Sequence, residues 1–244
     1  ALMSTIGAHV LDAKQRLAEG LDQLRRRHDR GAGGAEVCAA ITALRDDVLV
    51  ELFSRALDDV ASDAPEGFRE SVALVAHGGH GRRQASPGSD VDLMLLREGP
   101  PSEAAARLAR RVMHDAFDAG LALGHSVRGP REACRLAMGD VVIGTSLMDS
   151  RFLAGSAAIF HDYSSLLRQR IDRHRGALRA AIQKSRDEER LRYGETVYLL
   201  EPNIKRSRGG LRDLQLLRWL ARACYGVDTL DALRAGREPP DLPI

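Results

Sequence analysis

The chain opens with two stretches whose apolar residues recur at helical spacing. Val10, Leu17 and Leu21 follow this spacing in the first stretch, and a second series runs from about residue 35 to residue 59. Glycines at positions 31, 33 and 34 separate the two stretches, and Pro65 follows the second. The pattern predicts two helices in an N-terminal helical region, residues 1–67.

The period of the pattern changes after this region. Short apolar runs at residues 71–76, 91–96 and 121–127 are typical of buried β-strands. Residues 102–119 predict a helix with Ser102 as its N-cap. The segment from Gly78 to Ser89 is rich in Gly, Arg, Ser and Pro, so we expect it to form no regular element.

The rest of the chain is predicted to be mostly helical. From residue 130 to residue 194 the pattern is almost wholly helical. Within it, the core side of a long helix is marked by Ile159, Phe160, Tyr163, Leu167, Ile171, Leu178 and Ile182. A second irregular segment lies between Pro202 and Gly210, a final helix is expected at residues 211–224, and residues 238–244 look like a linker. Helices on both sides of a small strand cluster predict an α+β fold.

Composition excludes several classes of protein. With 44% hydrophobic and 29% charged residues among 244, the chain is typical of a globular protein. Its apolar runs are too short for a bilayer and no secretory leader opens it, so we expect a cytoplasmic protein without a membrane partner. A net charge of +2 does not indicate nucleic acid. Three widely spaced cysteines argue against a disulfide framework or structural zinc.

Two aspartates at the start of the second predicted strand are the main candidates for chemistry. Alternation along a strand puts the side chains of Asp90 and Asp92 on one face, while Val91 points into the core. Paired carboxylates need a counter-charge, and Mg²⁺ provides one because it binds hard oxygen ligands, water and substrate phosphates. Two such ions could activate an attacking oxygen and hold a leaving pyrophosphate.

The segment before the aspartates suits a triphosphate. Gly78 and Gly79 let backbone amides approach phosphate groups, and Arg82 and Ser89 could add hydrogen bonds. An Asp-x-Asp alone, or a Gly-Gly alone, is usually a turn. Their combination, with a strand before the glycines and another after the first aspartate, is far rarer and favours a site for a nucleotide and metal.

This arrangement resembles that of the polymerase-β-type nucleotidyltransferase superfamily. Within it, Gly78-Gly79-His80-Gly81-Arg82 and Ser89-Asp90-Val91-Asp92-Leu93 look like a segment of the PII uridylyltransferase/uridylyl-removing enzymes. Three further segments are similar to signatures of that family: Gly124-His125-Ser126-Val127-Arg128, Glu201-Pro202-Asn203-Ile204-Lys205 and Gly209-Gly210-Leu211-Arg212-Asp213. The resemblance covers about residues 71–226.

The resemblance implies a polymerase-β-like fold with a small mixed sheet and extensive flanking helices. Residues 68–155 would form the catalytic core, and residues 156–244 a C-terminal helical region that completes the nucleotide site. The implied reaction transfers UMP from UTP to a tyrosine hydroxyl of a PII signal protein in nitrogen-status signalling, with two Mg²⁺ (or Mn²⁺) ions held by Asp90 and Asp92. Full-length members also carry uridylyl-removing and glutamine-binding domains, which we expect this chain to lack.

The superfamily generally needs a third carboxylate near the first two. Asp140 is our first candidate for this catalytic role and Asp149 the second. Each also has a structural interpretation, because Asp140 could be a helix N-cap and Asp149 could pair with Arg151 or a neighbour.

The chain departs from the family's pattern beside the aspartates. His80, Arg83, Gln84 and Gly129 stand where Tyr, Gly, Glu and Thr are usual. These positions flank the metal-binding pair, so the departures concern nucleotide preference and loop geometry rather than the pair itself.

Further nucleotide contacts are predicted outside this segment. On the third strand, Ser126 and Arg128 share one face, although a surface arginine is the structural alternative. In the second irregular segment, Asn203, Lys205 and Arg212 offer a neutral donor and two cations.

The second irregular segment has a structural interpretation of its own. It could be a polar turn that caps the final helix. If the segment instead contacts a ligand, Asp213 could orient the neighbouring Arg212. On the functional interpretation, the first amides of that helix would suit an anion.

Two other functions are compatible with the sequence. The same domain could use ATP to adenylylate a different protein, and competition between UTP and ATP for binding would separate the two. It could also be a catalytically degenerate module that only binds a nucleotide, as Arg83, Gln84 and the undetermined third carboxylate suggest.

Overall fold

In the computed structural model, residues 6–193, 200–201, 203–227 and 235 are described. The chain divides into two compact units. The first contains residues 1–133 and 149–164, and the second contains residues 134–148 and 165–244. The division of the sequence into three regions, with boundaries at residues 67 and 155, stays a prediction.

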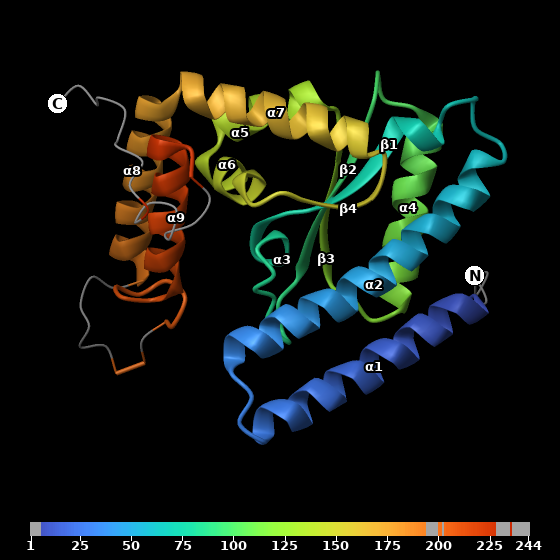
Figure 1. The fold of residues 1–244 in the computed structure, drawn as a ribbon, viewed down its shortest axis with the longest axis horizontal. Helices are drawn as coiled ribbons and strands as arrows, with labels where there is room; N and C mark the ends of the chain where they lie inside the picture. Colours follow the sequence, from blue (N-terminus) through green and yellow to red (C-terminus); the bar gives the residue numbers. More distant parts are fainter. Residues whose placement is uncertain (1–5, 194–199, 202, 228–234, 236–244) are drawn as a thin grey trace. The chain divides into compact units, whose positions relative to one another are not determined.

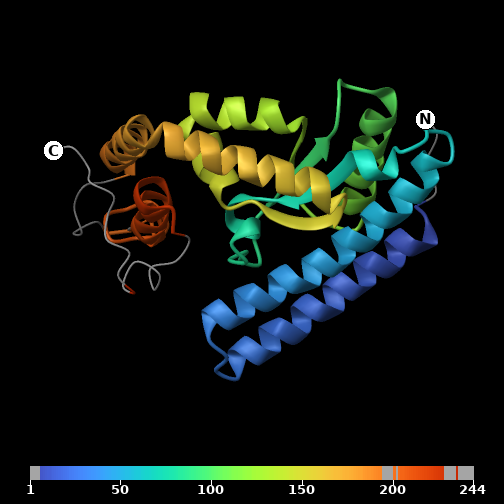
Figure 2. The ribbon, with the colours of Figure 1, turned by 45° about the horizontal axis from the view of Figure 1, so that its top comes forward.

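Two long helices open the first unit, as the apolar spacing predicts. α1 (Ala8–Asp29) and α2 (Gly34–Ala61) lie side by side (Figures 1 and 2). The 3-10 turn η1 (Arg69–Ser71) leads from these helices into the sheet. α4 (Glu103–Asp118) packs against α2, and the Ser102 hydroxyl accepts a hydrogen bond from the Ala105 amide at 3.2 Å. The predicted N-cap is confirmed.

The first unit contains a four-stranded mixed sheet with the order β3-β2-β1-β4 (Figure 1). Its strands are β1 (Val72–Ala76), β2 (Val91–Arg97), β3 (Leu123–Arg128) and β4 (Arg151–Gly155). β1 pairs antiparallel with both β2 and β4, whereas β2 and β3 run parallel. Because β1 is a central strand, all five of its residues are buried, which explains its unbroken apolar run.

One face of the sheet carries the core of the first unit. Val72, Leu74, Val91, Leu93 and Leu95 are buried there against apolar residues of α1, α2 and α4. Side chains alternate between the faces of a sheet, so Asp92 belongs to the opposite face. A slip of one residue would bring the Asp92 carboxylate onto the core face, so burial of the apolar set on that face fixes the side of the sheet to which Asp92 belongs.

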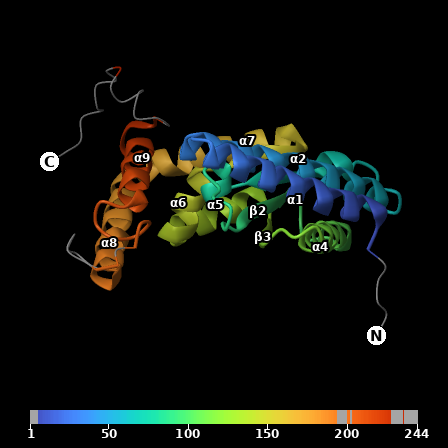
Figure 3. The ribbon, with the colours of Figure 1, turned by 90° about the horizontal axis from the view of Figure 1, so that it is seen from below.

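The second unit is helical. α6 (Val141–Met148), α8 (Arg175–Tyr193) and α9 (Leu211–Tyr225) belong to it, and α8 and α9 lie side by side (Figure 3). α5 (Pro130–Gly139) and α7 (Ala157–Arg173) each run from one unit into the other. α9 ends at Gly226, whose φ of 66° gives a left-handed cap that glycine adopts easily.

Three predictions about regular structure are wrong. The run at 130–194 contains β4, whose five residues form a strand by pairing with the free edge of β1. The predicted long helix is two helices, because α7 ends at Arg173 and α8 begins at Arg175, although six of the seven predicted core residues are buried. The segment after β1 contains one helical turn, α3 (Gly78–Gly81), despite the low helix propensity of glycine.

These elements confirm an α+β fold with a small mixed sheet and many helices, as expected for a nucleotidyltransferase-type domain. None of the helices in the described ranges is both long enough and apolar enough to cross a membrane. Gly194, Pro202 and residues 238–244, which figure in the sequence predictions, lie outside the described residues.

Candidate active site

The candidate site of the first unit lies on the sheet face opposite the core. In the parallel ladder, Asp92 on β2 is the register partner of Gly124 on β3, and Met94 is the partner of Ser126. Arg128 lies two residues beyond Ser126 and shares its face. The predicted alternation is therefore confirmed, and it places Asp92, Ser126 and Arg128 on one side of the sheet.

The Asp92 side chain leans across the ladder onto β3. A Cβ added to Gly124 would lie only 2.9 Å from Asp92 Oδ1, so the carboxylate occupies space that any other residue would fill. Sequence analysis noted Gly124 only within a motif, and the structure gives it a physical role. Because the glycine has no side chain, it leaves room for the Asp92 carboxylate over β3.

His77, which sequence analysis did not single out, stands next to Asp92. Its amide donates to the Asp92 carbonyl at 3.0 Å, at the point where β1 ends. Burial lowers the pKa of His77 below its ordinary value, although the charge of Asp92 acts in the other direction. Burial therefore favours the neutral form of the imidazole. The only signal in the sequence was its position between the strand and the glycines.

Asp90 is exposed and lies just before β2, where α2 holds the chain through Arg45. The Arg45 guanidinium, on a residue only 5% exposed, donates to the carbonyls of Pro87 at 2.8 Å and Ser89 at 3.1 Å. It also donates to the Ser86 carbonyl at 3.4 Å. Burial lowers the pKa of Arg45, and the negative charge of Asp90 opposes this. Arg45 thus fixes the backbone that leads into Asp90.

The next residue of α2 holds the glycine turn. Asp46 Oδ1 lies 2.8 Å from His80 Nε2, and Arg151 of β4 donates to both Asp46 oxygens, at 3.0 and 2.8 Å. Burial of Asp46 opposes ionisation, but the hydrogen bonds from His80 and Arg151 outweigh it and lower the pKa of Asp46. His80 is 1% exposed. The departure from the family's usual tyrosine therefore supplies a buried link between α3 and α2.

The glycines of the turn have different reasons to be glycine. Gly78 has a φ of +58°, which disfavours other residues. A Cβ on Gly81 would meet the Asp149 carbonyl oxygen at 1.9 Å, whereas one on Gly79 would make only ordinary contacts. Arg83 has a φ of +58° as well. It stands where the family resemblance expects glycine, so it adopts this conformation at a cost of about 1 kcal/mol.

Of the two candidates for a third carboxylate, Asp149 lies in the first unit with Asp90 and Asp92. Its Oδ2 accepts a hydrogen bond from Arg82 at 2.6 Å, and both residues are largely buried. Asp149 and Asp92 also act on the same His77 imidazole. Arg82, which was predicted to contact phosphate, is thus engaged in an ion pair with Asp149. Its phosphate contact stays a prediction.

Asp140, the first candidate, lies in the second unit. Its Oδ1 accepts hydrogen bonds from the amides of Val142 at 2.8 Å and Ile143 at 3.1 Å. This is the geometry of an N-cap for α6, which was the structural interpretation of this aspartate. Its catalytic role stays a prediction.

Ser89 is engaged in the loop before Asp90. Its hydroxyl accepts from the Ser86 amide at 3.1 Å and lies 2.7 Å from the Ser86 hydroxyl. On β3, one terminal nitrogen of Arg128 is buried and has no hydrogen-bond partner among the described residues. Among the residues of the first unit that were predicted to contact the nucleotide, Arg128 therefore has an unused N–H donor.

The donor set suits a magnesium ion bound mainly by water and phosphate. Asp90 and Asp92 offer hard carboxylate oxygens, which Mg²⁺ prefers. Within the described residues, no three His, Cys, Asp or Glu side chains come together closely enough to hold a metal ion. A metal at Asp90 and Asp92 would accordingly complete its shell with water and substrate oxygens, as Mg²⁺ commonly does.

In the second unit, residues 203–210 form a turn that is closed by its own hydrogen bonds. The Asn203 side-chain oxygen accepts from the amides of Lys205 at 3.1 Å and Arg206 at 2.9 Å. A Cβ on Gly210 would meet the Ile204 carbonyl oxygen at 2.5 Å, so only glycine fits there. Asn203 thus acts as a turn residue, and nucleotide contacts by Asn203 and Lys205 stay predictions.

Arg186 of α8 holds this turn and was missed by sequence analysis. Only 3% exposed, it donates to the Arg206 carbonyl at 2.8 Å and to Asp213 Oδ1 at 2.8 Å. Burial of Arg186 opposes its charge, but Asp213 and Glu189 outweigh it and raise the pKa of Arg186. A single arginine in an arginine-rich helix gives no sequence signal that it is buried.

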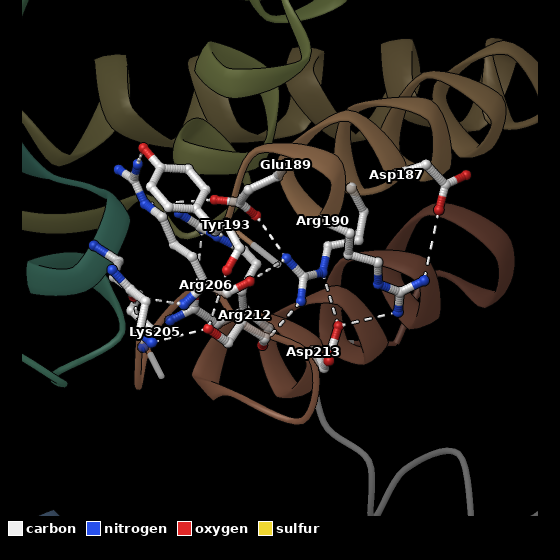
Figure 4. A network of polar contacts seen from close by, with 12 residues as sticks. Asp187, Glu189, Arg190, Tyr193, Lys205, Arg206, Arg212 and Asp213 are labelled. Carbon is white, nitrogen blue, oxygen red and sulfur yellow. Dashed lines mark hydrogen bonds and ion pairs between the residues drawn. The ribbon is translucent and has the colours of Figure 1, made fainter. Parts of the chain in front are cut away.

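Asp213 pairs with α8 rather than with Arg212. Its carboxylate accepts hydrogen bonds from Arg186, from Arg190 at 3.2 Å and from the Gly209 amide at 2.7 Å (Figure 4). The hydrogen bond from Arg186 is the main cause that lowers the pKa of Asp213 to about 2. Arg212 instead donates to Gln215 at 2.9 Å.

The start of α9 does not offer its amides to an anion. The amides of Leu211 and Arg212 donate to the carbonyls of Ile204 at 3.0 Å and Lys205 at 2.8 Å, and the Asp213 amide donates to Gly210 at 3.0 Å. The expectation of an anion site at these amides is wrong, because the preceding turn folds back and satisfies them.

We predict that Arg45→Met loosens the loop before Asp90. The substitution keeps an apolar stem but removes the donors to three carbonyls, at a cost of about 1–3 kcal/mol. Hydrogen exchange at the amides of Ser89 and Val91 should accelerate. Arg55→Met, on an exposed arginine of the same helix that pairs with Glu51, is the matched control and should leave this exchange unchanged. Equal exchange in both variants would contradict the positioning role of Arg45.

We also predict that Asp213 makes the second unit sensitive to acid. Its folded-state pKa of about 2 lies below the ordinary 3.8, so its stabilisation is full above pH 4 and is lost as the pH falls through 2. The urea midpoint, followed through the fluorescence of Trp219, the single tryptophan, should be lower for Asp213→Asn than for the wild type at pH 6. The gap should narrow at pH 3 and below.

Asp187→Asn serves as the control for the acid experiment. Asp187 is an exposed partner of Arg190, and such pairs contribute at most about 1 kcal/mol. A gap between wild type and Asp213→Asn that stays constant from pH 6 to pH 2.5 would refute the assigned ionisation.

Comparison with known proteins supports the resemblance given by the motifs. A family profile described as GlnD PII-uridylyltransferase matches residues 176–238. Bifunctional uridylyltransferase/uridylyl-removing enzymes align with most of the chain. That of Rhodospirillum rubrum is 34% identical over 223 residues, 90% of this chain and 24% of the relative. That of Thiobacillus denitrificans is 37% identical over 216 residues, 87% of this chain and 24% of the relative.

A third relative extends the alignment. The bifunctional uridylyltransferase/uridylyl-removing enzyme of Gluconobacter oxydans is 33% identical over 239 residues, which is 94% of this chain and 24% of the relative. The chain thus spans about a quarter of the length of the curated relatives it matches. With its motifs, its α+β fold and this similarity over most of its own length, the chain belongs to the family of the bifunctional uridylyltransferase/uridylyl-removing enzymes.

Proposed function

We propose that the chain is a nucleotidyltransferase domain that transfers UMP from UTP to a tyrosine hydroxyl of a PII signal protein. The names of its relatives support uridylyl transfer, and the name of the matching profile supports a PII protein as acceptor. The observation that carries the proposal is the position of Asp92. Its carboxylate lies over Gly124, on the sheet face away from the core, beside the end of β1 and the glycine turn.

The proposed reaction is a substitution at phosphorus. The phenolic oxygen of the acceptor bonds to the α-phosphorus of UTP, and the bond from that phosphorus to the α,β-bridging oxygen breaks. Pyrophosphate leaves, and the phenolic proton passes to water. The products are a uridylylated tyrosine and pyrophosphate. Nucleotide binding must therefore place the α-phosphate where a protein hydroxyl can reach it in line with the leaving group.

Asp90 and Asp92 would hold two magnesium ions, which neutralise phosphate charge and activate the attacking oxygen when bound. The α2 residues Arg45 and Asp46 keep the aspartate loop and the glycine turn in place. The backbone at Gly78 and Gly79 leaves room for a phosphate chain, and Arg128 has an unused donor on the Asp92 face. These groups bind and orient the triphosphate while the acceptor protein brings the nucleophile.

The second candidate is a module that binds a nucleotide without transferring it. One observation favours it: the described residues gather no third carboxylate into a metal site, and Asp149 is ion-paired with Arg82. Incorporation of labelled UMP into a PII protein decides between the two candidates. Binding of UTP without incorporation, under conditions where a full-length relative is active, would favour the binding module.

We predict that Asp92→Ala abolishes transfer. Loss of a metal-binding carboxylate removes several kcal/mol of transition-state stabilisation, so labelled UMP incorporation with magnesium should fall by roughly a thousandfold. Asp63→Ala, at an exposed aspartate of the same unit, should retain activity. Circular dichroism and the thermal midpoint should be near wild type for both variants. Undiminished incorporation by Asp92→Ala would sink the proposed role of this residue.

Gly124→Ala is predicted to impair catalysis more than stability. The new methyl group would displace Asp92 Oδ1, the end of a side chain that can rotate, so we expect the thermal midpoint to change by only a few degrees. The metal-binding carboxylate would nevertheless move, and kcat should fall by about tenfold or more. Gly88→Ala, where a Cβ meets open space, is the control. Similar kcat values for both variants would contradict the contact.

A further inference from the structure

The second unit contains a cavity that none of the roles above explains. It has a volume of about 410 Å³ and lies between α6, α8 and the start of α9. Pockets that hold small molecules usually range from about 300 to 1,000 Å³. The volume is therefore sufficient for a small organic ligand and much larger than an inorganic ion needs.

One side of this cavity carries more positive than negative charge. Glu189 is an ion-pair partner shared by three lining arginines, Arg186 at 3.0 Å and Arg206 and Arg212 at 3.5 Å each (Figure 4). Arg186 also pairs with Asp213. Four arginines (Arg186, Arg192, Arg206 and Arg212) and two glutamates (Glu188 and Glu189) are among the described residues that line the cavity. The surplus charge is positive.

Arg192 adds a further cation to the cavity wall. It is exposed at the end of α8, lines the cavity, and makes no hydrogen bond or ion pair with any residue that the structure describes. Guanidinium groups present planar forks that match phosphate oxygens two at a time. An arginine without a carboxylate partner is the group in this cavity that is best able to bind an anion.

The other side of the cavity is apolar and aromatic. Trp219, Leu216, Ile182 and Val141 line it, and Trp219 is only 7% exposed. The Arg212 guanidinium lies 5.2 Å from the centre of the Trp219 ring, so the cationic and aromatic walls meet at this pair. A ligand that fills the cavity must therefore combine an anionic group with a flat or apolar part.

We propose that this cavity binds a nucleoside phosphate, with the phosphates toward Arg192 and Arg206 and the base against the wall that contains Trp219. Free phosphate would leave the apolar wall and most of the volume unused. The cavity is partly open to solvent, but its volume of about 410 Å³ fits one small molecule better than a run of peptide residues. All the described residues that line the site belong to the second unit, and they include neither Asp90 nor Asp92.

The single tryptophan of the chain makes the proposal directly testable. UTP is titrated into the intact chain in EDTA, without magnesium, and Trp219 emission is followed with free tryptophan as the control for light absorption by the nucleotide. We expect saturable quenching by UTP. Uridine and pyrophosphate should each bind at least about tenfold more weakly than UTP. Uridine lacks the phosphates that the arginines would bind, and pyrophosphate lacks the base that would contact the apolar wall. Equal affinity for UTP and either fragment would overturn the proposal, as would no saturable change.

Paired variants of α8 locate the binding site. Arg192→Gln should weaken UTP binding by about tenfold, the loss expected for a charge-assisted hydrogen bond. Arg179→Gln, at an exposed arginine of the same helix that does not line the cavity, should bind like the wild type. Equal affinities for the two variants would overturn the assignment of the site.

The same titration separates this inference from the proposed transferase activity. Asp92→Ala should lose UMP transfer and keep the metal-free quenching, because Asp92 is not part of the cavity. If the wild-type chain shows metal-free quenching but no UMP transfer, the result supports the cavity and contradicts the proposed transferase activity. UMP transfer by the wild-type chain without metal-free quenching would support the transferase activity and overturn the cavity proposal.

Discussion

Two consecutive residues of α2 fix the geometry on which the candidate active site depends. Arg45 hydrogen-bonds the backbone before Asp90, and Asp46 binds His80 of the glycine turn together with Arg151 of β4. The segment between β1 and β2 has little regular structure, so its buried polar groups need partners from elsewhere. Because both residues come from one helix that is anchored in the core, the two ends of the segment are held to the same support.

In the second unit, too, a buried arginine provides hydrogen bonds to the backbone of an irregular segment. Arg186, buried in α8, satisfies carbonyls of the turn at 203–210 and pairs with Asp213 at the start of α9. A buried guanidinium is costly unless its donors are matched, and here backbone oxygens and carboxylates match them. In both units, therefore, a buried arginine on a long helix orders an irregular, glycine-containing segment.

Some polar residues hold the backbone of the irregular segments, whereas others have donors that remain available for a ligand. Asn203, predicted to contact a nucleotide, accepts hydrogen bonds from two amides of its own turn, and Asp213 accepts one from the Gly209 amide. Among the described residues, guanidinium groups with unused hydrogen-bond donors are found at Arg128 on the sheet and at Arg192 beside the cavity of the second unit. The proposed transferase chemistry belongs to the first unit, whereas the proposed nucleoside phosphate site belongs to the second.

The sequence by itself determined the local structure and the family. Apolar periodicity gave α1, α2, α4, α9 and the first three strands, because burial of an apolar face depends on spacing along one segment. It also put Asp92 on the face away from the core. Only the tertiary structure decided the contacts between segments. β4 forms because β1 has a free edge, and Gly124 matters because β3 lies beside Asp92. Arg45 and Arg186 are recognised only once their distant carbonyl partners are brought to them, since long-range pairing leaves no periodic signal in the chain.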